Sequence, residues 1–170
     1  MAIKIRPIVV KDAASYRRCY DAVLKERLHF AEEEAPPLSV LRKNLRMSVR
    51  KKSPFLVAVD GERVVGWAAV LSSNFASLKH VGILGAGVLA GYRGNGLGRK
   101  LTERVLKLCG RRFDSVVLYA LGKNKRAQKL GKKLGFKRCA WVKNGAKMPY
   151  GYDDRVAMQK MMRGQHEDIY

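Results

Sequence analysis

The sequence predicts one α/β domain in which helices flank a central mixed β-sheet. Runs of β-branched and aromatic residues alternate with segments whose apolar residues recur every three or four positions. In chain order these segments give a strand, two helices, three strands, a helix, a strand, a helix and two strands. A chain of 170 residues that is 47% hydrophobic is long enough for one core of this kind. We expect a domain over residues 1–163 and a flexible tail over residues 164–170.

The beginning of the chain predicts a strand rather than a targeting segment. The first ten residues, MAIKIRPIVV, lack the order of charged, apolar and small residues that marks a secretory signal. No apolar run approaches the roughly 18 residues of a membrane span. We therefore expect a cytoplasmic protein without a membrane partner.

Two helices are predicted next. Asp12 can cap the first, whose apolar residues follow helical spacing as far as Leu28. The acidic run and the two prolines of residues 31–39 predict a break. Ser39 is then expected to cap a second helix, with apolar residues at positions 41, 45 and 49.

The middle of the chain predicts three strands and a helix. Residues 55–70, FLVAVDGERVVGWAAV, read as a hairpin that turns at Asp60-Gly61. Residues 80–90 predict a third strand, which leads into the segment YRGNGLGRKL. From Leu97 the apolar residues follow helical spacing, and Gly110 is expected to end that helix.

The last third of the chain predicts the remaining elements. Residues 115–121 read as a buried strand and residues 124–134 as a helix that Gly135 ends. Residues 136–142 and 155–162 predict the two closing strands.

Charge and cysteine content bound the possible partners. The chain has 35 Lys and Arg against 14 Asp and Glu, a formal net charge of +21, and residues 123–138 hold eight basic residues and no acid. Such a field attracts polyanions, so RNA, a ribosome surface or a phosphorylated cofactor are candidates, and a merely solvated surface is the alternative. Cys19, Cys109 and Cys139 lack the close spacing of a metal or redox site, and we expect reduced, semi-buried thiols.

The glycine-rich segment predicts an anion site. Gly94, Gly96 and Gly98 precede a helix whose first N–H groups have no intrahelical partner, and Arg93 adds positive charge. A flexible turn is the alternative. A nucleotide P-loop needs Lys-Ser or Lys-Thr after its last glycine, and a Rossmann fingerprint needs its third glycine one residue later, so neither motif is present.

Two motifs in register resemble the GCN5-related N-acetyltransferase (GNAT) family. YRGNGLG resembles the family's R-x-x-G-x-G loop, and NKRAQKLGKKLGF at residues 124–136 is similar to its N-x-x-A-x-x-L-x-x-x-x-G-F segment. The resemblance implies the GNAT fold, with acetyl-CoA as co-substrate, its pantetheine along the strand that ends at Val88 and its diphosphate on the loop. The residues implied in cofactor binding are Val88, Leu89, Arg93, Gly94, Asn95, Gly96, Leu97, Gly98, Arg99 and Asn124.

The resemblance also implies direct attack of an amine on the thioester, which needs a base, an oxyanion donor near Val88 and Leu89, and an acid. The family's usual glutamate and tyrosine fall at Ile83 and Gly131, so the catalytic residues stay unknown. Tyr119 and His80 are the candidates carried forward for catalysis. Other candidates on the acceptor side are Tyr150, Tyr152 and the run Glu32 to Glu34.

Glu26, expected on the first helix, is a candidate to hold the acceptor ammonium. The resemblance thus favours an N-acetyltransferase acting on a small amine, a protein α-amino group or a lysine. An acyl-CoA-binding or nucleic-acid-associated module with weak or no catalysis is the alternative. A monomer and a homodimer both stay open.

Overall fold

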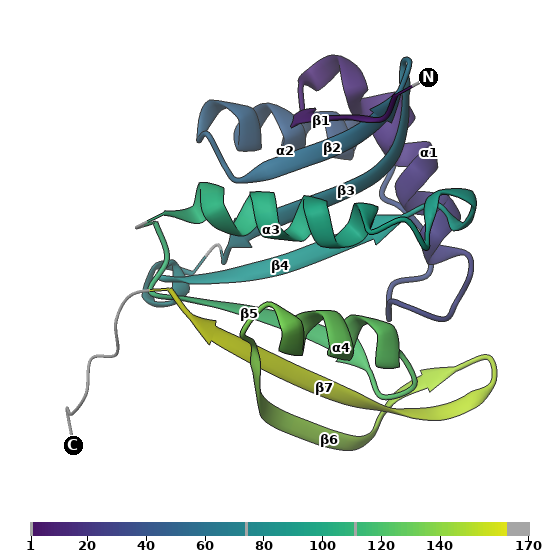
Figure 1. Ribbon diagram of the computed structural model, residues 1–170, viewed down its shortest axis with the longest axis vertical. Helices are drawn as coiled ribbons and strands as arrows, with labels where there is room; N and C mark the ends of the chain where they lie inside the picture. The colour runs from purple at the N-terminus through teal and green to yellow at the C-terminus, as the bar shows by residue number, and fades with distance from the viewer. Residues whose placement is uncertain (1, 74, 111, 163–170) are drawn as a thin grey trace.

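The computed structural model describes residues 2–73, 75–110 and 112–162. It confirms the predicted order of strands and helices (Figure 1). The strands are β1 (Lys4–Pro7), β2 (Phe55–Asp60), β3 (Arg63–Ser72), β4 (Val81–Val88), β5 (Ser115–Leu121), β6 (Lys137–Met148) and β7 (Gly151–Met161). The helices are α1 (Ala13–Leu24), α2 (Leu38–Arg50), α3 (Leu97–Cys109) and α4 (Lys125–Lys133).

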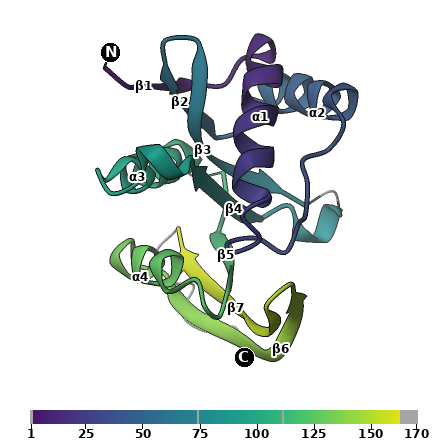
Figure 2. The same cartoon turned by 90° about the vertical axis from the view of Figure 1, so that its right-hand side faces the viewer.

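The strands form one seven-stranded mixed sheet in the order β1-β2-β3-β4-β5-β7-β6. Every neighbouring pair is antiparallel except β4 and β5. Helices α1 and α2 cover one face and α3 and α4 the other (Figure 2). Each helix pair therefore buries its apolar stripe against its own side of the sheet.

The core has two parts, one on each face. On the side of α3, Leu101 and Val105 are fully buried with Val116 of β5. On the side of α1, Val23 and Leu41 pack with Trp67 of β3. Trp67 lies over Gly87, where an added Cβ would come within 2.1 Å of the indole, so the glycine makes room for the ring.

Both predicted helix caps are corrected by the structure. Asp12 precedes α1 but makes no capping hydrogen bond to it, because its carboxylate accepts from Val9 N and from Arg6. Ser39 lies inside α2, whose N-cap residue is Pro37. The predicted first helix also ends early, at Leu24 instead of Leu28.

The two closing strands are longer than predicted. β6 continues to Met148 and β7 begins at Gly151, so Pro149 and Tyr150 make a tight turn. Irregular register between Arg138 and Ala140, and again between Val142 and Ala146, hides the alternation that would mark one long strand. The predicted tail over residues 164–170 lies outside the described residues.

The sheet opens at its centre. β4 and β5 pair only from Val81 to Leu84 on one strand and from Ser115 to Leu118 on the other. Beyond that point β4 stays paired with β3 and β5 stays paired with β7. The two strands therefore part, and one edge of β4 is left without a partner strand.

Within the part of the chain that the structure describes, no helix is long and apolar enough to cross a membrane.

Candidate active site

The glycine loop joins β4 to α3 in a conformation that leaves backbone N–H groups open. Gly94 and Gly96 have φ values of 93° and 75°, in the left-handed region that favours glycine. Gly96 is the N-cap residue, and the first intrahelical bond runs from Lys100 N to Gly96 O. The N–H groups of Leu97, Gly98 and Arg99 therefore stay available at the positive end of the helix dipole.

The open edge of β4 supplies further backbone groups. Leu89 N donates to Val65 O at 2.9 Å, so Leu89 faces β3. Because successive residues of an antiparallel strand face opposite neighbours, the N–H groups of Ala86 and Val88 face the gap between β4 and β5. Of the two residues around which the oxyanion donor is expected, Leu89 therefore has its N–H bonded to β3, whereas the N–H of Val88 faces the gap.

A cavity of 360 Å³ connects these two features, and we call it the loop cavity. It runs from the glycine loop along β4 to the inner side of α4. Its lining includes eight of the ten predicted cofactor residues, namely Val88, Arg93, Gly94, Gly96, Leu97, Gly98, Arg99 and Asn124. Leu89 and Asn95 are not among its lining residues, and Asn95 is exposed.

Asn124 and Arg99 each have a local partner as well. Asn124 Oδ1 accepts from Ala127 N at 3.1 Å and caps α4, which holds the side chain at the wall of the loop cavity. Arg99 Nε donates to Glu103 one helical turn further along, at 2.7 Å.

Arg93 positions the loop. Its Nε donates to Val88 O at 2.7 Å, and its two terminal nitrogens donate to the two oxygens of Glu26 at 2.8 and 2.7 Å. The guanidinium is thus engaged with protein groups, and it ties together the end of β4, the loop and the segment after α1. Glu26, expected on the first helix, lies in the turn that follows it.

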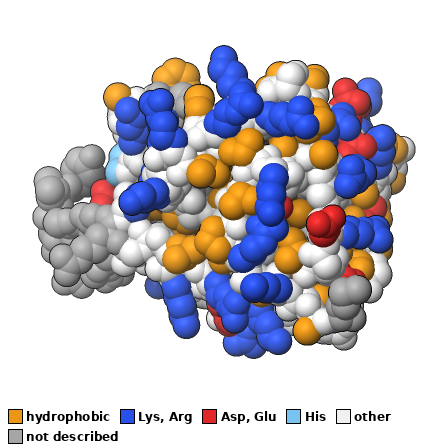
Figure 3. Space-filling view, turned by 90° about the horizontal axis from the view of Figure 1, so that it is seen from above, with side chains coloured by type: hydrophobic (Ala, Val, Ile, Leu, Met, Phe, Trp, Pro, Cys, Tyr) orange, Lys and Arg blue, Asp and Glu red, His pale blue; other side chains and the backbone are white. Residues whose placement is uncertain are grey.

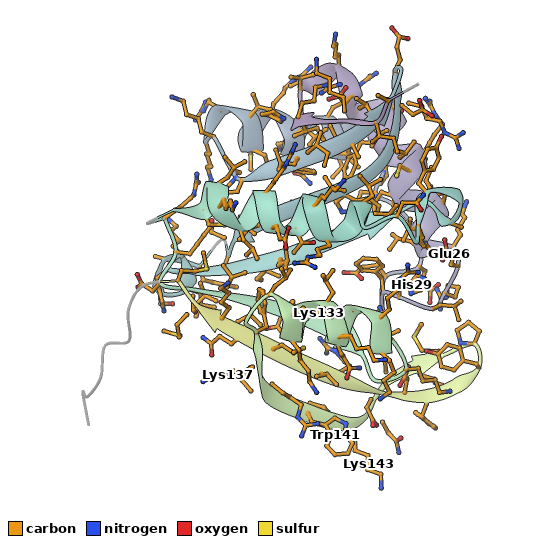
Figure 4. All side chains as sticks on the ribbon, viewed as in Figure 1. Glu26, His29, Lys133, Lys137, Trp141 and Lys143 are labelled. Atoms are coloured by element: carbon orange, nitrogen blue, oxygen red, sulfur yellow. The ribbon has the colours of Figure 1, made fainter. Side chains whose placement is uncertain are left out.

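His29 completes this cluster, with its Nε2 2.9 Å from Glu26 Oε2 (Figure 4). Burial opposes ionisation of the Glu26 carboxyl, but hydrogen bonds and charge from Arg93, with a further contribution from His29, lower its pKa below the usual range. The carboxylate is therefore ionised at neutral pH and already has two partners. His29 was not predictable from the sequence, because a single histidine in the turn after a helix carries no spacing signal.

A second cavity, of 430 Å³, lies beside the first and is walled by aromatic rings; we call it the aromatic cavity. Tyr20 packs edge-on against Trp67 with ring centroids 5.1 Å apart, and Phe30 stacks on Trp67 at 6.2 Å. Glu32 and Arg155 are the charged side chains that line it. Burial, with a smaller effect of the Glu32 charge, raises the pKa of Tyr20.

The two cavities meet where β4 and β5 part. The residues that line both are His29, Phe30, Leu84, Gly85 and Tyr119. Tyr119 is 55% exposed, and Arg155 lies 5.9 Å from the centroid of its ring. Of the two sequence candidates for catalysis, Tyr119 is thus brought to the junction.

His80, the other sequence candidate for catalysis, does not lie at the junction of the two cavities. It lies in the turn before Val81, at the end of β4 opposite the glycine loop, and lines neither cavity.

Tyr150 donates a hydrogen bond to Asp153 at 2.7 Å, and burial together with this bond raises the pKa of Tyr150 to about 12. Tyr150 and the exposed Tyr152 also lie outside both linings.

Ile83 and Gly131, the two positions that depart from the family motif, have no polar side chain that could replace the usual glutamate and tyrosine. Ile83 lines the aromatic cavity without a titratable group. Gly131 is buried on α4, where an added Cβ would lie 3.1 Å from Leu118 and 3.2 Å from the sulfur of Met158. A larger residue at that position would have to displace the core beneath α4.

A glycine loop at a helix N-terminus, next to a parted pair of strands, is a site for an elongated ligand with an anionic end. The family model described as "Acetyltransferase (GNAT) family" matches residues 16–136. The chain therefore belongs to the GNAT acetyltransferase family.

Solved structures agree on the fold. The yncA protein of Salmonella typhimurium, solved with its cofactor acetyl-CoA, superposes with a TM-score of 0.88 at 19% identity over 99% of each chain. A GNAT superfamily phosphinothricin acetyltransferase of Sinorhizobium meliloti, in complex with acetyl-CoA, gives 0.86 at 20% identity over 100% of this chain and 96% of that one.

A ribosomal-protein-alanine N-acetyltransferase of Brucella melitensis gives a TM-score of 0.82 at 24% identity, over 93% of this chain and 99% of that one. The comparison with curated protein sequences gives no match.

Proposed function

We propose that the protein transfers the acetyl group of acetyl-CoA to a primary amine. The meeting of the two cavities between β4 and β5 carries this proposal. A cofactor in the loop cavity and an amine in the aromatic cavity would bring thioester and nucleophile together. Holding two reactants in contact is itself a large part of catalysis.

The loop cavity suits acetyl-CoA at both ends. Diphosphate oxygens fit the free N–H groups of residues 97–99 and the dipole of α3. The amide-containing pantetheine fits the open edge of β4, where Ala86 and Val88 offer backbone groups as they would to an added strand. The acetyl group would then lie beside Tyr119.

The aromatic cavity suits an ammonium. Aromatic faces attract cations, and Glu32 adds a negative charge at the wall. Arg155 is a cation on the same lining. We therefore propose an acceptor that carries an anionic group as well as its primary amine.

His29 is our candidate for the base. An amine with a pKa near 10.4 must lose a proton before it attacks. Since ionised Glu26 accepts from Nε2–H of His29, the neutral ring carries its lone pair on Nδ1. The carboxylate also stabilises the imidazolium formed when Nδ1 takes the proton.

The bond changes follow from this arrangement. The amine nitrogen bonds to the carbonyl carbon, and Val88 N–H is placed to donate to the oxygen as negative charge develops there. The oxyanion then re-forms the carbonyl as the carbon–sulfur bond breaks, and the CoA sulfur takes a proton from the hydroxyl of Tyr119. The resulting phenolate takes the remaining extra proton from the acylated nitrogen, which leaves a neutral amide. The products are an acetylated amine and CoA.

Ile83 and Gly131 keep a second candidate function open. A protein that binds acyl-CoA but transfers little or nothing would also lack the family's usual carboxylate and tyrosine. The two functions differ in one observable, the formation of an acetylated acceptor.

The test uses labelled acetyl-CoA and a panel of small amines, amino acids and peptides with free α-amino groups or lysines. Mass spectrometry should find at least one labelled acceptor, with free CoA released in equal amount. If acetyl-CoA binds and no acceptor is ever labelled, the transferase proposal fails and the binding module stands.

A further inference from the structure

A long stretch of positive charge follows the glycine loop in the sequence, and of its basic residues Arg126 alone lines the loop cavity. The 38 residues from Ser115 to Tyr152 include ten Lys or Arg and no Asp or Glu. All ten basic side chains are exposed. The two acids that follow are engaged locally, since Asp153 accepts from Lys123 N and Tyr150, and Asp154 accepts from Asn144 N.

Part of this charge lies on α4 and on β6, the strand that follows it, and we call this set of residues the basic edge. It consists of Lys129, Lys132 and Lys133 on α4 and of Lys137, Arg138 and Trp141 on β6. The three lysines of α4 share one helical face because they are three and four residues apart. Figure 4 shows the labelled members along the α4 and β6 side of the molecule.

The basic edge is separate from the loop cavity. The α4 residues that line the cavity are Arg126, Ala127, Leu130 and Gly131, with Leu134 just beyond the helix. The lysines of the basic edge point elsewhere and are exposed. The lysines at 129, 132, 133 and 137 form no ion pair with a described residue, so their charge is free for a partner.

Trp141 adds an exposed aromatic ring to the basic edge. It is 58% exposed on an edge strand, with the guanidinium carbon of Arg138 5.7 Å from its ring centroid. Trp141 and Arg138 pair with Val156 and Met158, whose side chains are buried beneath α4, so both lie on the α4 side of the sheet. Lysines protect an edge strand from aggregation, whereas an exposed tryptophan does the opposite.

We propose that the basic edge binds single-stranded nucleic acid. Lysines that follow a groove or edge neutralise successive phosphates, and an exposed aromatic ring stacks on an unpaired base. The pairing of Arg138 with Trp141 adds a cation next to that stacking surface. An anionic membrane would use the lysines but would give no base to stack on Trp141.

The test measures binding of the full chain to labelled oligouridine and oligothymidine of about 15 nucleotides by fluorescence anisotropy at several salt concentrations. The two oligonucleotides distinguish RNA from DNA as the source of the ligand. The test variant changes Lys129, Lys132 and Lys133 to Gln, which keeps helix propensity. It should weaken binding about tenfold and reduce the salt slope by about 2, since each phosphate contact on a single strand contributes about 0.7.

A matched variant controls for net charge. Basic side chains are also spread over the opposite side of the molecule (Figure 3). Changing the exposed Arg42, Lys43 and Arg46 of α2 to Gln removes the same charge elsewhere, and it should weaken binding less than about twofold. Equal losses in the two variants would show a diffuse field and overturn the proposal.

Trp141 gives a separate readout. The chain has two tryptophans, and Trp67 is only 3% exposed. Nucleic acid should therefore quench the fluorescence of Trp141, and Trp141→Ala should abolish the quenching and weaken binding about tenfold. The proposal is overturned if neither oligonucleotide binds, if quenching persists without Trp141, or if only phosphatidylserine-containing vesicles bind.

Discussion

The proposed proton transfers depend on a few side chains at and near the junction of the cavities. We predict that His29→Ala lowers kcat by about 100-fold or more, because it removes the group that accepts the amine proton. Acetyl-CoA affinity, measured by calorimetric titration, should be unchanged. Glu26→Gln should lower kcat less, since the ring would remain but lose the carboxylate that orients it.

His80→Ala provides the matched control, because His80 lies at the other end of β4. It should leave kcat unchanged. A His29→Ala enzyme with full activity would show that water chains, and not this imidazole, deprotonate the amine.

The three thiols should differ in reactivity. Burial raises the pKa of Cys19 to about 12 and that of Cys109 to about 11, whereas Cys139 is exposed. At neutral pH we expect iodoacetamide to label Cys139 first in the folded protein, as checked by peptide mass spectrometry. Fast labelling of Cys19 would contradict its burial in the α1 core.

The raised pKa values of Cys19 and Cys109 predict how the stability of the folded protein changes with pH. Both thiols are held in the neutral form when folded, so their contribution to stability is complete below about pH 8.5, the usual thiol pKa. It is lost as the pH rises from there toward 11, because only the unfolded chain ionises freely.

Among single residues, the lining of the loop cavity was more predictable from the sequence than the lining of the aromatic cavity. Gly96 and Asn124 belong to contiguous motifs whose spacing is visible along the chain. The cluster of Glu26, His29 and Arg93 joins residues 64 and 67 positions apart, and no local pattern shows such a contact.

The glycine loop and α3 form the element whose geometry can be tested most cleanly. Gly98 lies in the first turn of α3, where an added Cβ would meet Val88 at an ordinary 3.6 Å. We predict that Gly98→Glu abolishes acetyl-CoA binding by placing a carboxylate in the loop cavity. Its thermal stability should not fall, because a negative charge near a helix N-terminus is favourable.

Gly98→Ala is the matched variant, and it should retain most of the affinity for acetyl-CoA. Calorimetry on both variants decides the matter. Undiminished binding by Gly98→Glu would place the diphosphate somewhere other than the loop.

The packing of β4 against β3 can be tested through Gly87. Because an added methyl group would overlap the Trp67 indole, Gly87→Ala should lower the free energy of unfolding by about 1 to 3 kcal/mol. Gly85→Ala is the control, since nothing lies within 4 Å of its added Cβ. Urea denaturation compares the two, and equal stabilities would mean that Trp67 moves aside without strain.

The order of the elements was predictable from the sequence, and several of their ends were not. Apolar periodicity identified the helices because each buries one face, and apolar runs identified the central strands, whereas β6 is exposed over most of its length. Caps depend on competing partners, as when Asp12 bonds Arg6 and Val9 instead of capping α1. The parting of β4 from β5 depends on pairing between distant strands, so the sequence could not show it without the family resemblance.

The charge of the whole molecule should influence which acceptors are used. With a net charge of +21, the protein repels polyamines at long range, and this repulsion is screened by salt. We predict that kcat/KM for a polyamine rises with ionic strength and that kcat/KM for an amine of net negative charge, which bears more than one carboxylate, falls. A monoamine that bears one carboxylate has no net charge and should change little.

Steady-state rates at low and high salt provide the measurement. The same salt trend for all three acceptors would mean that net charge does not steer the substrate, and that Arg155 and Glu32 act only within the aromatic cavity.

The proposed transfer depends most on where the acyl end of the cofactor lies in the assembled molecule. A crystal structure of the complex with acetyl-CoA tests this directly. We expect the diphosphate on the N–H groups of residues 97–99, the pantetheine along Ala86 and Val88, and the thioester between Val88 N–H and Tyr119, open to the aromatic cavity. An acetyl group found away from the junction of β4 and β5, with no path to His29, would contradict the proposed transfer.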